Sequence, residues 1–148
     1  MYEVWFVVRY LHLISAAVLL GGATLLSWDH SQASWSQSRV QLAAAYEQVF
    51  WMVAALLTVT GVSNLGLKGA GLLGVDTRWG RVLLFKLAVV LLFLAGSFVR
   101  TTFVSQCAVL GVTALRRNRR MIAMLYAVTA LTMCGMLCLG LGLAHGRY

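Results

Sequence analysis

Four long apolar stretches constrain the fold of this chain more than any other feature of its sequence. They occupy residues 5–28, 40–67, 78–103 and 119–144, and only short polar segments separate them. A helix needs roughly 20 apolar residues to cross the hydrocarbon layer of a bilayer, and each stretch reaches that length. None alternates between apolar and polar residues as a half-buried strand does. Because helices satisfy their own backbone hydrogen bonds in lipid, the sequence predicts an all-α integral membrane protein, a four-transmembrane-helix bundle.

Composition excludes the other broad classes. Of the 148 residues, 61% are hydrophobic and 11% are charged, against about 45–50% and about 25% in soluble domains. A soluble globule, a disordered chain and a nucleotide-binding α/β enzyme are therefore excluded. The three cysteines are too scattered for a disulfide framework. The length fits a single membrane domain, residues 1–148, whose expected partner is the lipid bilayer and not a nucleic acid.

The distribution of positive charge predicts how the chain is oriented. The first stretch follows Glu3 instead of a basic cluster and is long for a signal peptide, so we expect a retained helix. Four spans place both termini on one side. The four arginines within residues 116–120 favour a cytoplasmic position for the loop at 105–120. We therefore expect a multi-pass protein of the bacterial inner (plasma) membrane with external, periplasmic termini.

Basic residues at membrane depth form the first candidate site. His12 and Lys86 enter their spans from the same side and reach a similar depth, and Arg9 precedes His12 by one turn. No carboxylate lies at that level, and a charge at the bilayer centre costs about 2.5–3.5 kcal/mol on insertion scales. An anionic cofactor would supply the missing partner: heme b, with His12 as axial ligand and Lys86 or Arg9 at its propionates. Alternatively, the two cations reach the headgroups and His12 bonds a neighbouring helix.

Sulfur-containing residues on the last span form the second candidate site. Cys134 and Cys138 are neighbours at the i, i+4 spacing, Met136 lies between them, and His145 falls on the same helix face about 10 Å further along. Thiolates and thioethers are ligands that Cu(I) prefers, so this face predicts a copper site. Ordinary packing is the alternative, because Met and Cys also fill apolar cores.

Polar residues near the loops are open to two interpretations. Asp29, His30 and Glu47 either form a metal site of oxygen and nitrogen ligands or are solvated loop ends. The glycine-rich segment 68–77 is typical of a mobile or re-entrant loop, and Cys107 is expected in the loop before the last span. The sequence contains no hydrolytic metal motif, nucleophile elbow or phosphate-binding loop, which disfavours an enzyme acting through its own side chains.

Short motifs give the chain a family resemblance. Thr60, Gly61 and Val62 end the second span, the run TRWGRVLLFK at 77–86 opens the third, and Leu11, His12, Gly21 and Gly22 mark the first. In these positions the chain resembles the copper resistance protein D (CopD) family of bacterial membrane proteins. The resemblance implies a membrane protein that handles or transports copper.

The same residues are similar to a related four-span group, the HemJ-type protoporphyrinogen oxidases. That resemblance implies heme b binding, with His12 and Lys86 in that role. The loop SWDHSQ stands where the group has a longer acidic and histidine-rich stretch, so the resemblance does not extend to the oxidase activity. The sequence thus leaves three hypotheses: copper handling, a heme b redox protein, or an accessory subunit of a larger complex or homo-oligomer that packs through glycine-rich faces.

Overall fold

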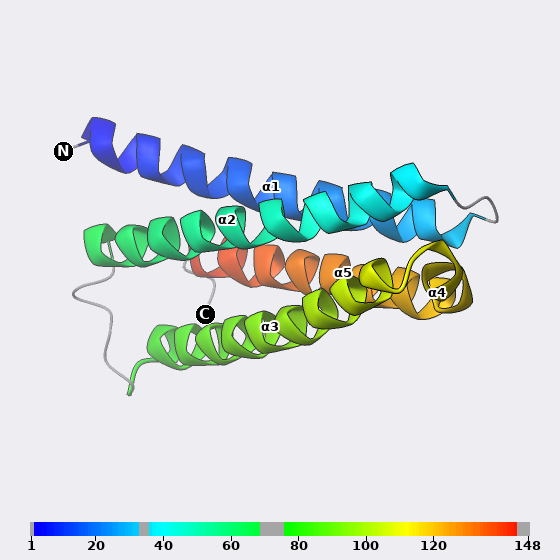
Figure 1. The fold of residues 1–148 in the computed structure, drawn as a ribbon. Coiled ribbons are helices and arrows are strands. Elements are labelled where there is room, and N and C mark those ends of the chain that lie inside the picture. Colours follow the sequence, from blue (N-terminus) through cyan, green and yellow to red (C-terminus); the bar gives the residue numbers. More distant parts are fainter. Residues whose placement is uncertain (1, 33–35, 69–75, 145–148) are drawn as a thin grey trace.

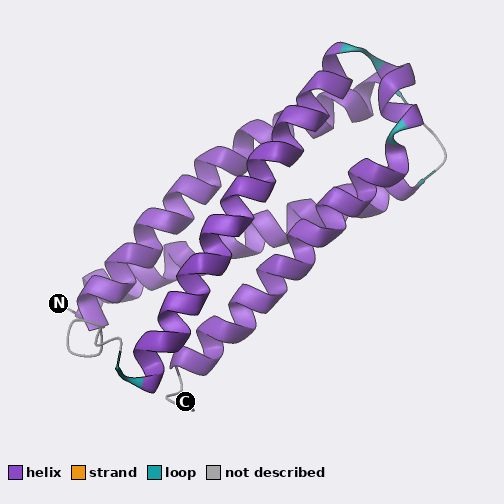
Figure 2. Cartoon of the chain, turned by 90° about the horizontal axis from the view of Figure 1, so that it is seen from below, coloured by secondary structure: helices purple, strands orange, loops and turns teal. Residues whose placement is uncertain are grey.

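The computed structural model describes residues 2–32, 36–68 and 76–144, and these residues form helices joined by short turns (Figures 1 and 2). The helices are α1 (Tyr2–Ser31), α2 (Gln37–Lys68), α3 (Arg78–Val109), the short α4 (Val112–Arg117) and α5 (Arg119–Ala144). Four of them are long and apolar enough to cross a membrane. The described ranges contain no strand, and the predicted all-α four-helix bundle is confirmed. The predictions for segment 69–75 and for His145 lie outside the described residues.

The helix boundaries differ from those expected at the end of the bundle that contains α4. The loop predicted to begin at residue 105 is wrong, because α3 continues to Val109 and Cys107 lies within it, buried. The inward face of α3 continues through Val104 and Cys107, and both pack in the core with Leu115 of α4. Gly111, with a φ of 89°, then reverses the chain in a backbone conformation that a side chain would strain.

The helices pack in a ring, with α1 against α2 and α5, and α3 against α5 and, less extensively, α2. Helices α1 and α3 therefore lie diagonally across the bundle. The start of α1, the start of α3 and the end of α5 lie at the same end of the bundle (Figure 1). We call this end the terminal end. The opposite end, where α4 lies, is the α4 end.

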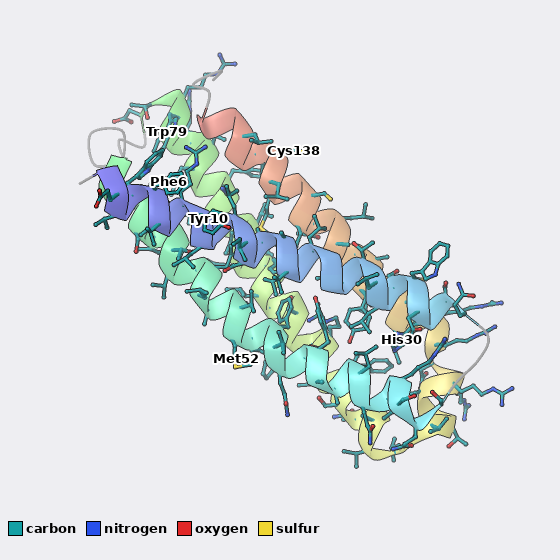
Figure 3. All side chains as sticks on the ribbon, turned by 90° about the horizontal axis from the view of Figure 1, so that it is seen from above. Phe6, Tyr10, His30, Met52, Trp79 and Cys138 are labelled. Atoms are coloured by element: carbon teal, nitrogen blue, oxygen red, sulfur yellow. The ribbon has the colours of Figure 1, made fainter. Side chains whose placement is uncertain are left out.

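The bundle places polar residues inside and apolar residues outside. Leu92 is 73% exposed on the outer surface, whereas Glu47 and Arg100 are 3% and 1% exposed inside the bundle. Met52 projects outward from α2 in the same way (Figure 3). A soluble protein shows the reverse arrangement, since charged residues are almost never fully buried there unless they are paired. The outer surface therefore suits contact with lipid chains.

Buried apolar side chains are concentrated in the middle of the bundle and toward the α4 end. Going toward the terminal end, the last ones are Ala16 on α1, Ala54 on α2, Phe93 on α3 and Met133 on α5. Beyond them, within the described residues, the buried positions are Ser15, Thr60 and Gly80. The terminal end is thus the less densely packed part of the bundle, and it contains both His12 and Lys86.

Candidate functional site

The imidazole of His12 is held by the backbone and a hydroxyl of α2. Its Nδ1 lies 3.1 Å from the carbonyl oxygen of Leu57 and 3.0 Å from Oγ1 of Thr60. The carbonyl oxygen only accepts hydrogen bonds, and the Thr60 hydroxyl donates its proton to the Leu56 carbonyl at 2.7 Å. Both neighbours of Nδ1 therefore act as acceptors, which assigns the proton of the neutral ring to Nδ1.

This tautomer leaves Nε2 of His12 with a lone pair. Nε2 makes no hydrogen bond to any residue in the ranges that the structure describes. A histidine that ligates a metal typically donates its other ring N–H to a carbonyl or carboxylate, and this second contact fixes the ring. The contacts of His12 with Leu57 and Thr60 follow that pattern. The ring is therefore oriented to offer one nitrogen as a ligand.

Two glycines make room for the basic side chains at the terminal end. A Cβ atom on Gly61 of α2 would lie 3.2 Å from Cε1 of His12, and one on Gly140 of α5 would lie 3.1 Å from Nζ of Lys86. Both side chains are half-buried, and both lie at the terminal end of the bundle. Two diagonally opposed helices thus place a histidine and a lysine at the same end of the bundle.

Arg9 does not join this pair. Its side chain is exposed, and its guanidinium lies 5.1 Å from the centre of the Trp5 ring. Among the described residues, the ion pairs join carboxylates to His30, Arg39 and Arg100, and none includes Arg9 or Lys86. Of the three predicted residues, His12 and Lys86 are half-buried at the terminal end and Arg9 is exposed, and the described part of the chain provides no carboxylate partner for Lys86.

The sulfur residues of α5 face different surroundings. Cys134 and Cys138 are exposed on the outer surface of the helix, with Cys138 near the terminal end (Figure 3). Met136 is half-buried and packs against the core cluster around Met133 and Phe93. No group of three or more His, Cys, Asp or Glu side chains that could hold a metal ion occurs among residues 2–32, 36–68 and 76–144. Within those ranges, a metal ion at Cys134 and Cys138 would find these two thiols but no third His, Cys, Asp or Glu ligand.

Glu47 and Arg100 form a buried ion pair that sequence reasoning missed. Glu47 was expected at a solvated loop end or in a metal site, and both interpretations are wrong, since it is buried well inside α2. Nε and Nη2 of Arg100 donate to the two carboxylate oxygens of Glu47, each at 3.0 Å. Tyr126 donates to Oε1 at 2.7 Å, and the Thr101 hydroxyl donates to Oε2. Every oxygen of this carboxylate is therefore satisfied, as a buried charge requires.

Aromatic rings and a hydroxyl complete the surroundings of Arg100. Its Nη1 donates to Oγ1 of Thr129 on α5 at 2.7 Å. The guanidinium carbon lies 4.2 Å from the centre of the Phe50 ring and 5.1 Å from that of Tyr126. A cation over a ring face is attracted by the ring quadrupole. The cluster therefore joins α2, α3 and α5 through one fully compensated cation.

Asp29 and His30 do not meet Glu47 at a metal site. Asp29 pairs with Arg39 at 3.2 Å, and Arg39 also donates to the Asp29 carbonyl at 3.0 Å, which ties the end of α1 to the start of α2. His30 is buried at the α4 end, with Nδ1 2.9 Å from the Leu26 carbonyl (Figure 3). Its ring centre lies 5.7 Å from that of Tyr126. These contacts indicate a structural role in closing the α4 end.

No family model, curated protein or solved structure matches this chain. The resemblance to the CopD family and to the HemJ-type group therefore stays a prediction that rests on short motifs. The function has to be argued from the geometry of the side chains.

Proposed function

We propose that this chain is a multi-pass membrane protein that binds heme b at its terminal end, with His12 as axial ligand, and serves in electron transfer. One observation carries the proposal. Nδ1 of His12 is engaged by the Leu57 carbonyl and the Thr60 hydroxyl, at 3.1 and 3.0 Å, and Nε2 is left for a ligand. Bound heme would supply one-electron redox chemistry.

Lys86 supplies the second element of the proposed site. It is a half-buried lysine at membrane depth without a carboxylate partner among the described residues. A buried cation requires compensation, and the propionates of heme are anions that match it. Lys86 would bind and orient the carboxylate edge, while Leu57 and Thr60 hold the His12 ring. Gly61 and Gly140 have no side chain that would crowd these two residues.

Absorption spectroscopy of the purified protein tests the proposal. The protein, reconstituted with hemin in detergent, is expected to show a Soret band that His12→Ala abolishes. His30→Gln is the matched control, because His30 also lies on α1 and its Nδ1 also lies at a backbone carbonyl. Lys86→Met should weaken heme binding and Lys86→Arg should restore much of it. A wild-type protein that gives no Soret band after reconstitution, or a band that depends on His30 instead, contradicts the proposal.

The proposed orientation places the termini outside the bacterial inner membrane. The arginines of residues 116–120 lie at the α4 end, where α4 ends and α5 begins, and positive residues favour the cytoplasmic side. A single cysteine introduced at Ser38 of a cysteine-free variant should resist a membrane-impermeant maleimide in intact cells. One introduced at Asp76, at the terminal end, should react. The reverse labelling pattern would overturn the orientation.

Copper binding is the second candidate function, and the exposed pair on α5 favours it. Cys134 and Cys138 lie one turn apart on one helix face, and both side chains are accessible from outside the bundle. Two neighbouring thiolates suit Cu(I). Competition with a Cu(I) chelator should reveal a site that disappears in the Cys134→Ser, Cys138→Ser variant and persists in Cys107→Ser. Equal copper binding by all three proteins would reject these residues as ligands.

A further inference from the structure

A cavity of about 360 Å³ lies between α3 and α5 and is open on one side. Its size falls in the range of small-molecule sites, about 300–1,000 Å³. Two Val and two Leu side chains, together with Phe93 and Gly96 of α3, form its apolar wall. Polar side chains line it as well, among them Ser97, Arg100 and Thr129. The cavity thus combines a largely apolar wall with a small number of polar groups, as ligand sites do.

Ser97 is the polar group of this cavity that lacks a partner. It is 3% exposed, and its hydroxyl makes no hydrogen bond with any residue that the structure describes. The other hydroxyls of the wall differ, because Thr129 donates to the Leu125 carbonyl and Thr132 to the Val128 carbonyl, each at 2.8 Å. Serine in a helix commonly makes the same bond to its own backbone. The Ser97 hydroxyl is therefore available to donate a hydrogen bond to a ligand in the cavity that it lines.

Arg100 determines the charge of the ligand that the cavity can accept. Three of its five N–H groups are engaged, two by Glu47 and one by Thr129. The Glu47 carboxylate, 3.0 Å away, already neutralises the guanidinium. An added anion would therefore be uncompensated in a region of low dielectric, which is costly. A neutral molecule with a hydrogen-bond acceptor fits the cavity better than an anion does.

We infer that this cavity binds a membrane-dissolved quinone. A quinone ring is neutral and planar, and its carbonyl oxygens accept hydrogen bonds. The Ser97 hydroxyl would donate to one carbonyl, the Phe93 ring provides an aromatic wall for the quinone ring, and the open side leads to the lipid for an isoprenoid tail. The inference does not depend on the His12 site, because its evidence comes from other residues and its test detects quinone binding without heme.

Titration calorimetry on the full chain in lipid nanodiscs free of quinone tests this inference. The probe is a ubiquinone analogue with a single isoprene unit. Gly96→Leu should fill the cavity, because a Cβ on Gly96 meets no atom within 4 Å and Gly96 lines the wall. We expect the Kd for the ubiquinone analogue to rise more than about tenfold, because the leucine side chain would occupy the volume that the quinone ring needs. Ser97→Ala removes one hydrogen bond, which corresponds to roughly a threefold to tenfold rise in Kd.

Gly135→Leu is the matched control. A Cβ on Gly135 also meets no atom within 4 Å, and this glycine of α5 is not part of the cavity wall. The Kd of the Gly135→Leu variant for the ubiquinone analogue should stay near the wild-type value. Circular dichroism should report the same helix content for all variants. Equal weakening by Gly135→Leu, or wild-type affinity in both Gly96→Leu and Ser97→Ala, would overturn the inference. Displacement of the probe by palmitate at equal affinity would also overturn it, and would instead indicate a groove for acyl chains.

Discussion

Arg100 and Lys86 both project from α3 into the bundle, but the chain treats the two cations differently. Arg100 is fully buried, bonded to Glu47 and Thr129, and surrounded by aromatic rings. Lys86 is half-buried beyond the last buried apolar residue of α3, with no carboxylate partner in the described ranges and with Gly140 beside it. The Arg100 charge is therefore paired within the chain, whereas under the proposed function Lys86 takes its anionic partner from a bound cofactor.

Glu47→Gln should produce the largest loss of stability. Removing the carboxylate charge leaves Arg100 buried and unpaired, and breaking a buried ion pair in this way costs about 3–5 kcal/mol. Unfolding in mixed detergent micelles, followed by circular dichroism, measures the change. The double variant Glu47→Leu, Arg100→Leu should be more stable than Glu47→Gln, because it removes both charges. A Glu47→Gln protein as stable as wild type would show that the pair is not essential to the α4 end.

Gly22→Ala should cost less, about 1–3 kcal/mol, because it overpacks a close crossing of α1 and α2. The new Cβ would clash with Cε2 of Tyr46, and the hydroxyl of that ring donates to the Leu19 carbonyl at 3.0 Å. The ring must therefore shift and strain this bond. Gly21→Ala is the control, since its Cβ meets no atom within 4 Å and alanine favours a helix. Equal stability of the two variants, measured by thermal unfolding, would refute the close contact.

Lys86→Met should leave the stability of the heme-free protein unchanged or raise it by up to about 2 kcal/mol, since it removes an uncompensated charge from the membrane interior. Arg100→Met, a change of the same type on the same helix, should lower stability because it leaves the Glu47 carboxylate without its cation. Thermal unfolding of both variants without heme gives the comparison directly. A clear loss of stability in Lys86→Met would mean that the lysine already has a partner within the chain.

Gly61→Ala should have the smallest effect on stability, within about 1 kcal/mol, because its Cβ meets only the edge of the His12 ring, at 3.2 Å. The His12 ring can shift by a few tenths of an ångström to relieve this contact. Heme affinity should nevertheless fall, since the second contacts of a metal-ligating histidine fix its orientation. Gly66→Ala is the control on the same helix, with open space at its Cβ. Heme titration of both variants would detect the difference, and identical affinities would contradict the proposed orientation of the ring.

The sequence was sufficient for the four spans and for placing His12 and Lys86 at the same end of the bundle. Counting residues from the same side of the membrane gave the two groups similar depths, and depth is a property that helical rise determines. Helical rise does not determine the direction in which a helix face points. Cys134 and Cys138 share a face as expected, but packing turns that face outward. Arg9, one turn from His12, likewise lies on the outside.

Errors at the helix ends concealed the pair of Glu47 and Arg100. Ending the third span at residue 103 placed Arg100 near the membrane edge, whereas α3 continues to Val109. In the structure Glu47 lies ten residues after the start of α2 and Arg100 nine residues before the end of α3. Two consecutive antiparallel helices therefore carry opposite charges at almost the same height. With correct boundaries, this match would have predicted the ion pair.

The bond between Glu47 and Arg100 has a consequence for biosynthesis. An arginine entering lipid alone faces a large insertion penalty, but α2 and α3 are neighbours in the chain and carry mutually neutralising groups. The two segments are therefore best released from the translocon together, as a hairpin whose charges are already joined. Helix α5, which follows them in the chain, then contributes Tyr126 and Thr129 to close the hairpin's polar interior.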